Sequence, residues 1–310
     1  MRAREWGAFW LLGTIWGSSY LWIKIALAET GPLTLAAVRL LFGLAGLAAV
    51  AWATRQALPR DPRLAARFAV LGLLNTALPF ALISWGETRI ASGPAAVLTG
   101  TTPLFALVIA HFWLRDEPMT PARAAGLVLG LAGVVLLVHR GAGPAAGGSD
   151  GVAGEAAVLT AACSYAVAAT YARRYLRGQP PLLQAASAVF AADAMLWLAV
   201  PAAEWPLRVP RLPLTWLALG WLGLAGTCLG YLLYYYLFNA WGAARATTVT
   251  YVFPVIGVLL GVAFLGESVS AQSAAGTVLV VTGIVVANRP ARPRIAPAGA
   301  VSAAAAAGDG

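Results

Sequence analysis

Long apolar runs alternate along the chain with short polar segments, which carry most of its charges. Each run covers about 18 to 23 residues, the length that an α-helix needs to cross the hydrocarbon core of a bilayer. We therefore predict an all-α integral membrane protein with ten transmembrane helices. Their expected ranges are Trp6–Leu27, Leu33–Ala53, Phe68–Trp85, Ala91–Leu114, Ala122–Val138, Gly154–Tyr175, Leu182–Val200, Leu214–Leu237, Ala244–Leu265 and Ser273–Ala287.

The second half of the chain repeats the first, at a separation that changes once from 151 to 150 residues. The matches include Thr76 with Thr227, Thr99 with Thr250, Pro103 with Pro254, Glu117 with Glu267, Gly126 with Gly276 and Gly133 with Gly283. These matches predict an internal duplication. We expect a first repeat at residues 1–140, a linker at 141–152, a second repeat at 153–289 and a disordered cytoplasmic tail at 290–310. With five spans each, the second repeat enters the membrane upside down.

The arginines predict the orientation. If the N-terminus is cytoplasmic, the inside segments contain fifteen arginines and the outside segments only four. This bias follows the positive-inside rule in both halves. We expect a multi-pass protein of the cell's inner (plasma) membrane with both termini in the cytoplasm.

Composition narrows the class further. Hydrophobic residues make up 60% of the 310 residues and charged residues 11%, which excludes a soluble globular protein. The net charge of +9 reflects topology, so no nucleic-acid partner is expected. Cys163 and Cys228 lie in apolar runs without metal-ligand spacing and are expected to be buried thiols. Neither a metal nor another cofactor is predicted, and a homodimer stays open.

A proline stands in the middle of two matched spans. Pro103 has no N–H, so the carbonyl of Thr99 loses its helical partner, and Pro254 does the same to the carbonyl of Thr250. Lipid offers no replacement donor. The prolines either mark a polar midplane site or only kink the two helices for packing.

Polar stripes run along other spans. Trp16, Ser19 and Tyr20 recur at helical spacing in the first span, and Tyr231 and Tyr235 share a face of the eighth. Such side chains line a cavity or hydrogen-bond between helices. A similar stripe in the sixth span contains Ser164, Ala168 and Tyr171.

Ionisable residues inside spans are informative, because a charge there is costly unless it is paired or hydrated. Lys24 and Arg39 either form a cationic clamp for a carboxylate-bearing solute, or they snorkel toward the interface or pair structurally with Glu29 or Glu87. Asp193 is either a proton-coupling carboxylate or a polar packing group. The full set expected to bind substrate is Trp16, Ser19, Tyr20, Lys24, Arg39, Thr99, Thr102, Pro103, Tyr231, Tyr235, Thr248, Thr250 and Pro254.

The expected spans and their ends contain several short motifs. These are Trp16-Gly17 with Lys24, Arg39, Thr101-Thr102-Pro103-Leu104-Phe105, Leu114-Arg115-Asp116-Glu117, Phe253-Pro254-Val255 and Phe264-Leu265-Gly266-Glu267. With five plus five spans, the chain resembles EamA-type members of the drug/metabolite transporter superfamily. The resemblance implies export or exchange of small metabolites, such as amino acids, through a central cavity between the repeats.

Three classes of function remain. A secondary transporter that works by alternating access is expected to have interrupted helices at one depth in both repeats. A membrane-embedded enzyme would need a catalytic constellation, and His111 and His139 form no paired-histidine motif. A structural or interaction protein would not need mid-membrane prolines. The chain contains no Gly-rich phosphate loop before Lys-Ser/Thr, so it is not by itself an ATP-driven pump.

The topology can be tested with an impermeant thiol reagent on intact cells, using single cysteines in a variant without Cys163 and Cys228. Cysteines at positions 30, 144 and 207 should react from outside, and cysteines at positions 60 and 178 should not. Labelling at position 178 would overturn the inverted arrangement.

Overall fold

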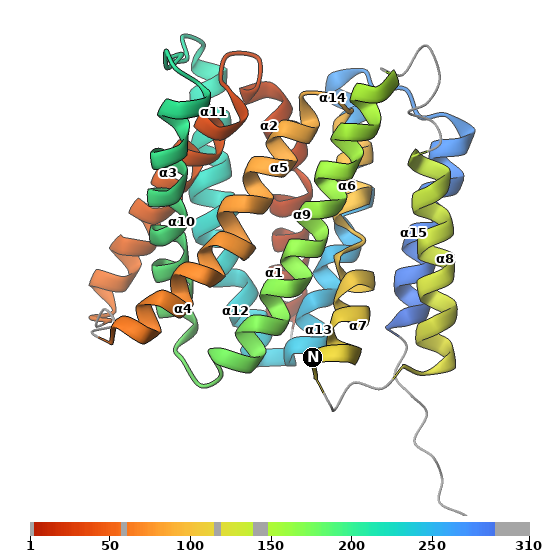
Figure 1. Ribbon diagram of the computed structural model, residues 1–310, viewed down its shortest axis with the longest axis horizontal. Coiled ribbons are helices and arrows are strands. Elements are labelled where there is room, and N and C mark those ends of the chain that lie inside the picture. The colour runs from red at the N-terminus through yellow and green to blue at the C-terminus, as the bar shows by residue number, and fades with distance from the viewer. Residues whose placement is uncertain (1–2, 57–60, 115–118, 139–147, 289–310) are drawn as a thin grey trace, which may run out of the picture.

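The computed structural model describes residues 3–56, 61–114, 119–138 and 148–288, and all regular structure in these ranges is helical (Figure 1). The elements are α1 Ala3–Gly17, α2 Ser19–Ala26, α3 Pro32–Ala53, α4 Pro62–Gly72, η1 Leu73–Ala77, α5 Leu78–Glu87, α6 Ser92–Thr99, α7 Thr102–Trp113, α8 Pro121–Val138, α9 Gly148–Tyr175, α10 Pro181–Ala203, α11 Pro213–Gly220, η3 Trp221–Leu229, α12 Gly230–Trp241, α13 Ala243–Ala246, η4 Thr247–Tyr251, α14 Val252–Leu265 and α15 Ala271–Ala287.

Eight helical stretches among the described residues are long and apolar enough to cross a membrane. Some join several elements: α4, η1 and α5 form Pro62–Glu87, and α11, η3 and α12 form Pro213–Trp241. The first and last of the ten expected spans fall short of that length, because the first is divided at Ser18 and α15 has 17 residues. The count of ten therefore stays a prediction.

The division at Ser18 is a local distortion of one helix. The Ser18 N–H donates to the Thr14 carbonyl at 2.8 Å, and the Trp22 N–H donates to the Ser18 carbonyl at 3.2 Å. The hydroxyl of Ser18 also donates to the Ile15 carbonyl at 2.9 Å, a backbone contact of the kind that bends helices. Helical hydrogen bonds thus continue from α1 into α2.

Several helices begin before the apolar runs that predicted them. The helix expected from Phe68 begins at Pro62, where the Asp61 side chain caps the N–H of Arg63 at 2.9 Å. A capping carboxylate followed by proline starts a helix whether or not its first turn is apolar. Likewise, residues 148–152, expected to be linker, form the first turns of α9.

Helices α8 and α15 pack against each other more closely than any other pair of elements and lie side by side at the right of Figure 1. A Cβ at Gly126 would lie 2.5 Å from the Gly283 carbonyl oxygen, and one at Gly133 would lie 2.7 Å from the Gly276 oxygen. The pairing of 126 with 283 and 133 with 276 is antiparallel. Gly130, between these two glycines on α8, faces Leu104 and Gly283.

On the side opposite the N-terminus, uppermost in Figure 1, carboxylates cap the first turns of other helices. Glu204 accepts hydrogen bonds from the N–H groups of Leu33 at 2.7 Å and Thr34 at 2.9 Å at the start of α3. Glu267 caps α6 in the same way, and Glu29 accepts from the N–H of Leu212 just before α11 and from the Thr215 hydroxyl in its first turn. A carboxylate at a helix N-terminus satisfies free N–H groups and complements the helix dipole. These caps join segments far apart in the chain.

The Glu29 cap should make stability depend on pH. The Thr215 hydroxyl at 2.6 Å and the N–H groups of Leu212 and Arg211 lower the pKa of Glu29 from its ordinary value of 4.5. Because the folded state favours the ionised form, this stabilisation is complete above pH 4.5 and is lost as pH falls through the lowered pKa. Glu29→Gln should therefore lower the Tm at neutral pH and match the wild type in acid. A Tm difference that stays constant from neutral to acid pH would contradict this.

The labelling positions can be refined. Thr30 is buried and its hydroxyl donates to the Ala26 carbonyl at 2.7 Å, whereas Ala28 in the same loop is exposed. Positions 60 and 144 lie outside the described residues. Ala28 is therefore the better reporter for this side of the protein.

Candidate solute-binding site

The first proline-containing span is interrupted where the sequence predicts. Helix α6 ends at Thr99 and α7 begins at Thr102, with Gly100 and Thr101 between them. The Thr102 hydroxyl donates to the Thr99 carbonyl at 2.7 Å, which replaces the N–H that Pro103 lacks. The freed carbonyl is thus satisfied locally and does not point into an open space.

The second span responds differently to its proline. Before Pro254 the chain tightens into the 3₁₀ segment η4, Thr247–Tyr251. The Thr248 hydroxyl donates to the Arg245 carbonyl at 2.7 Å, and the Thr250 hydroxyl to the Thr247 carbonyl at 2.9 Å. The threonines near both prolines therefore bond to their own backbone, as does Thr99, whose hydroxyl donates to the Ala95 carbonyl.

The two interruptions meet. A Cβ at Gly100 would lie 2.9 Å from Cγ of Pro254, and one at Gly257 would lie 2.3 Å from Cβ of Ala96. Further along, a Cβ at Gly93 would lie 3.4 Å from Cγ2 of Val258. Helix α6 therefore runs antiparallel against α14, and glycines allow the contact.

Two π-helical segments lie at matched positions in the duplicated sequence, η1 (Leu73–Ala77) and η3 (Trp221–Leu229). Each widened turn has a carbonyl that accepts a side-chain hydrogen bond from another span. The Ser164 hydroxyl donates to the Leu74 carbonyl at 2.7 Å, and Nε1 of Trp16 donates to the Gly226 carbonyl at 2.8 Å. π-Helical turns of this kind are frequent at functional sites.

Arg39, on α3, lies beside the second of these π-helical segments, η3, and next to α5. It is 6% exposed, its Nε donates to the Thr227 hydroxyl at 3.4 Å, and its guanidinium stacks 3.8 Å from the ring centre of Phe80. No other hydrogen bond of this side chain occurs among the described residues, so most of the five N–H donors of its guanidinium remain available. The Arg39 guanidinium is therefore a buried cation with unused donors.

Tyrosines surround this cation. Arg39 interacts electrostatically with Tyr20, Tyr165 and Tyr231, and with the carboxyl group of Glu87. The Tyr231 hydroxyl accepts a hydrogen bond from Nδ2 of Asn75 at 3.0 Å. Arg39, its three tyrosines and Asn75 are hereafter called the Arg39 cluster.

The other predicted site residues lie around this cluster. Tyr20 hydrogen-bonds Thr99, Tyr235 stacks on Tyr231 at 6.3 Å, and Trp16 packs 5.8 Å from Phe253. Ser19 donates to the Ile15 carbonyl at 3.3 Å.

Asp193 stands apart from this group. It hydrogen-bonds Trp197 on its own helix α10, and its Oδ1 has no partner among the described residues.

Sequence reasoning missed three residues of this region. Tyr165 directly follows Ser164 in the sixth span, and the stripe expected there included Tyr171, which instead stacks on Tyr175 at 4.9 Å. Asn75 is the one asparagine inside the third span and stands next to the matched Thr76. Glu87 ends that span and was considered only as a partner for a cation. An isolated polar residue inside or at the end of a span was the available signal.

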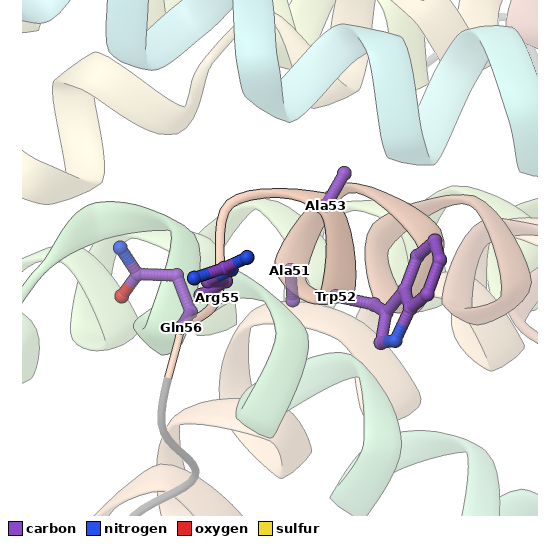
Figure 2. A pocket seen from close by; sticks show the side chains of 5 residues that line it. All are labelled: Ala51, Trp52, Ala53, Arg55 and Gln56. Atoms are coloured by element: carbon purple, nitrogen blue, oxygen red, sulfur yellow. The ribbon is translucent and has the colours of Figure 1, made fainter.

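Two hollows lie away from this cluster. One of about 830 Å³ separates parts of α3, α4 and α10 and is lined mainly by apolar side chains, including Trp52 and Phe190. The other, of about 570 Å³, lies at the end of α3 beside Ala51, Trp52, Ala53, Arg55 and Gln56 (Figure 2). Neither is lined by a residue predicted to bind substrate.

Comparison with known proteins identifies the family. The EamA-like transporter family matches residues 5–139 and again residues 152–289. The chain belongs to this family. An "Uncharacterized inner membrane transporter YedA" of Escherichia coli (strain K12) is 31% identical over 94% of each chain. An "Uncharacterized transporter" of Archaeoglobus fulgidus is 25% identical over 92% of this chain and 99% of its own.

A solved structure titled "Crystal structure of protein" shares the fold. The two structures superpose with a TM-score of 0.65 at 24% sequence identity, and the match covers 93% of this chain and 97% of the other. Together with the eight apolar helical stretches, membership of the EamA-like family makes the chain a multi-pass membrane protein of a transporter family.

In this EamA-family protein Lys24 acts as a helix cap. Its Nζ donates to the carbonyls of Glu87 at 2.5 Å and Ile90 at 2.7 Å, at the end of α5. A cation at a helix C-terminus satisfies free carbonyls and complements the dipole. Two of its three N–H donors are used, so the structural role of Lys24 is the one with observed contacts.

Lys24→Met should therefore destabilise the protein, by about 2 kcal/mol for two charge-assisted bonds whose acceptors lose their donor. The thermal midpoint in detergent measures this. Lys24→Arg keeps cationic donors and should retain more of the stability than Lys24→Met. An unchanged midpoint in Lys24→Met together with lost transport would contradict the capping role and favour a clamp.

Proposed function

We propose that the chain is a secondary transporter that moves small carboxylate-bearing metabolites across the inner membrane by alternating access. The observation that carries the proposal is the Arg39 cluster, a buried cation with unused donors beside the meeting point of two interrupted helices. Ionisable groups inside membrane spans are costly and usually mark substrate or ion sites.

The proposed architecture has ten spans in two inverted repeats. It is supported by the two family matches, by the equivalent π-helical segments and by the antiparallel packing of the matched helices α8 and α15. The arginine distribution favours cytoplasmic termini, which would make the side with Glu29, Glu204 and Glu267 the outer one.

The packing of the interrupted helices suggests which side is closed. On the outer side α6 packs along α14, with direct contact at Gly257 and Gly93. On the cytoplasmic side the continuations separate, since α7 packs on α9 and η4 packs on α1. The described conformation would then be closed outside, with any solute reaching the Arg39 cluster from the cytoplasm.

The meeting of Gly100 and Pro254 suits a change of conformation. The interrupted helices lie close together there, next to both interruptions, so the two halves could rock about this point and expose the Arg39 cluster to either side. Thr99, Thr102, Thr248 and Thr250 would then stabilise the interruptions, and Arg39, Tyr20 and Tyr231 would contact the solute.

The expected substrate feature is a carboxylate. A guanidinium offers paired donors that match a carboxylate, and a bidentate pair is stronger than a neutral hydrogen bond. Of the two cations expected to bind the carboxylate, only Arg39 remains a candidate, because Lys24 caps α5. The tyrosine hydroxyls around Arg39 can hydrogen-bond other polar groups of a small solute.

The test compares metabolites in the medium of cells that overexpress the wild type, Arg39→Met or Arg89→Met. Arg89 is a matched control, because its guanidinium also stacks on an aromatic ring, 3.6 Å from Trp85, but is exposed. The wild type and Arg89→Met should raise external carboxylate-bearing compounds. Arg39→Met should lower this release about tenfold or more, since hydrogen bonds to a charged group contribute about 1.5–3 kcal/mol.

Membrane abundance of each variant, measured on the same cells, separates transport from folding. No metabolite change with abundant wild-type protein would contradict the proposed function. Equal release by Arg39→Met and the wild type would remove Arg39 from the site.

A further inference from the structure

Glu87 is the last residue of α5 and is 0% exposed. Neither of its carboxyl oxygens has a hydrogen-bond partner among the described residues. An ionised carboxylate that is buried without a donor costs several kcal/mol, whereas the neutral acid costs far less. The surroundings of Glu87 therefore favour the form that carries a proton.

Charged groups from several elements face Glu87 without bonding to its carboxyl. It interacts electrostatically with Lys24 on α2, Arg39 on α3 and Glu267 after α14, and also with Tyr20. The Lys24 ammonium group donates instead to two backbone carbonyls. On the α9 side the atoms nearest to a Cβ at the neighbouring Gly86 belong to Gly154 and Val158, and the next α9 residue, Glu155, is not among the charged groups that act on Glu87.

The contrast with Glu267 is informative. Glu267 accepts hydrogen bonds from the N–H groups of Ser92 at 2.7 Å and Gly93 at 3.0 Å. A negative charge on Glu267 disfavours a second one on Glu87. The Ser92 hydroxyl is likewise buried without a partner. Glu267 thus caps the start of α6, whereas the carboxyl group of Glu87 has no hydrogen-bond donor among the described residues.

We propose that Glu87 binds one proton when the outer side is closed and releases it when the outer side opens, which couples transport to protons. The inference rests on the proposed alternating access. On opening, water reaches Glu87, its O–H bond breaks, the proton passes to water and the carboxylate remains near Lys24 and Arg39. On closing, the same oxygen takes up a proton from water before it is buried again.

This role belongs to one repeat only. At the separation of 151 residues, the position matched to Glu87 is Phe238, which cannot carry a proton. Asp193, the carboxylate that the sequence suggests for proton coupling, has a hydrogen bond to Trp197. It is the natural comparison residue, because it too has an oxygen without a partner.

The test follows opening of the outer side through a cysteine, so no substrate is required. Ser92→Cys is introduced into a variant without Cys163 and Cys228, because Ser92 is fully buried and its hydroxyl bonds to nothing among the described residues. Purified protein in detergent reacts with a maleimide from mildly acidic to mildly alkaline pH in sodium-free buffer. The rate is divided by that of the exposed Ala28→Cys, which removes the intrinsic pH dependence of the thiol.

With Glu87 present, the normalised rate should rise with pH, by at most about tenfold per pH unit for one released proton. Glu87→Gln should abolish this rise, while Glu87→Asp and Asp193→Asn should keep it. Glu87→Gln removes no hydrogen bond, and gel filtration and the thermal midpoint verify its fold. If Glu87→Gln does not fold, Glu87→Asp provides the test. This variant should keep the rise in rate, but at a shifted pH, because the shorter acid lies in a different environment.

A rise in Glu87→Gln equal to that of the parent variant would overturn the proposal. A rise that is lost only in Asp193→Asn would also overturn it. If Glu87→Gln is unfolded, a rise at the same pH in Glu87→Asp would overturn it. A rate that is constant across this pH range but changes when sodium is added to the buffer would also overturn it. The outcome does not depend on metabolite release. If the wild type releases metabolites but shows no Glu87-dependent pH response, the proposed function is retained and proton coupling through Glu87 is rejected. If the pH response is seen without metabolite release, proton-linked opening is retained and the proposed substrate class is rejected.

Discussion

Inside a membrane, a backbone N–H or carbonyl that leaves the helical ladder must find its partner within the protein. Most features of this fold follow from that constraint. Thr102 replaces the donor missing at Pro103, and Trp16 and Ser164 each donate to a carbonyl of a π-helical segment. At the helix ends, Glu204 and Lys24 satisfy first-turn N–H groups and last-turn carbonyls. Each of these irregular backbone segments is thus tied to a side chain, which except at Thr102 comes from a distant part of the sequence.

The sequence is duplicated, but Arg39 has no matching arginine in the second repeat. Gly72 and Gly223 are matched glycines: a Cβ at Gly72 would lie 2.3 Å from the Ala188 carbonyl oxygen, and one at Gly223 would lie 2.5 Å from that of Arg39. The residue that corresponds to Arg39 in the second repeat is therefore Ala188. Since a guanidinium occurs on one side only, a solute held there meets an asymmetric site within a nearly symmetric frame.

The apolar runs and the repeat separations were enough to predict an all-helical membrane protein and to locate its interrupted helices. These features depend on composition and on proline, which act locally. The site was harder to predict. Lys24 and Arg39 look alike in sequence, yet one caps α5 and the other stacks on Phe80 with donors unused. That difference depends on neighbours more than 40 residues away in the sequence.

The π-helical segments explain another gap in the prediction. A hydrophobic pattern with a period of 3.6 residues does not reveal where a helix widens, and a widened turn rotates every later side chain about the helix axis. Asn75 and Thr227 lie within such turns. Their positions beside Tyr231 and Arg39 therefore depend on a distortion that a regular helix count does not contain.

The pairing of α8 with α15 has a consequence for biosynthesis. Helix α8 lies near the middle of the chain, and its glycine surface faces the last helix that the structure describes. During synthesis α8 enters the membrane before its partner exists, so Gly126 and Gly133 stay uncovered until α15 emerges from the ribosome. A nascent chain that stops before Ala271 would present this surface to the membrane's quality-control machinery. The final helix thus completes the fold by joining the most closely packed pair.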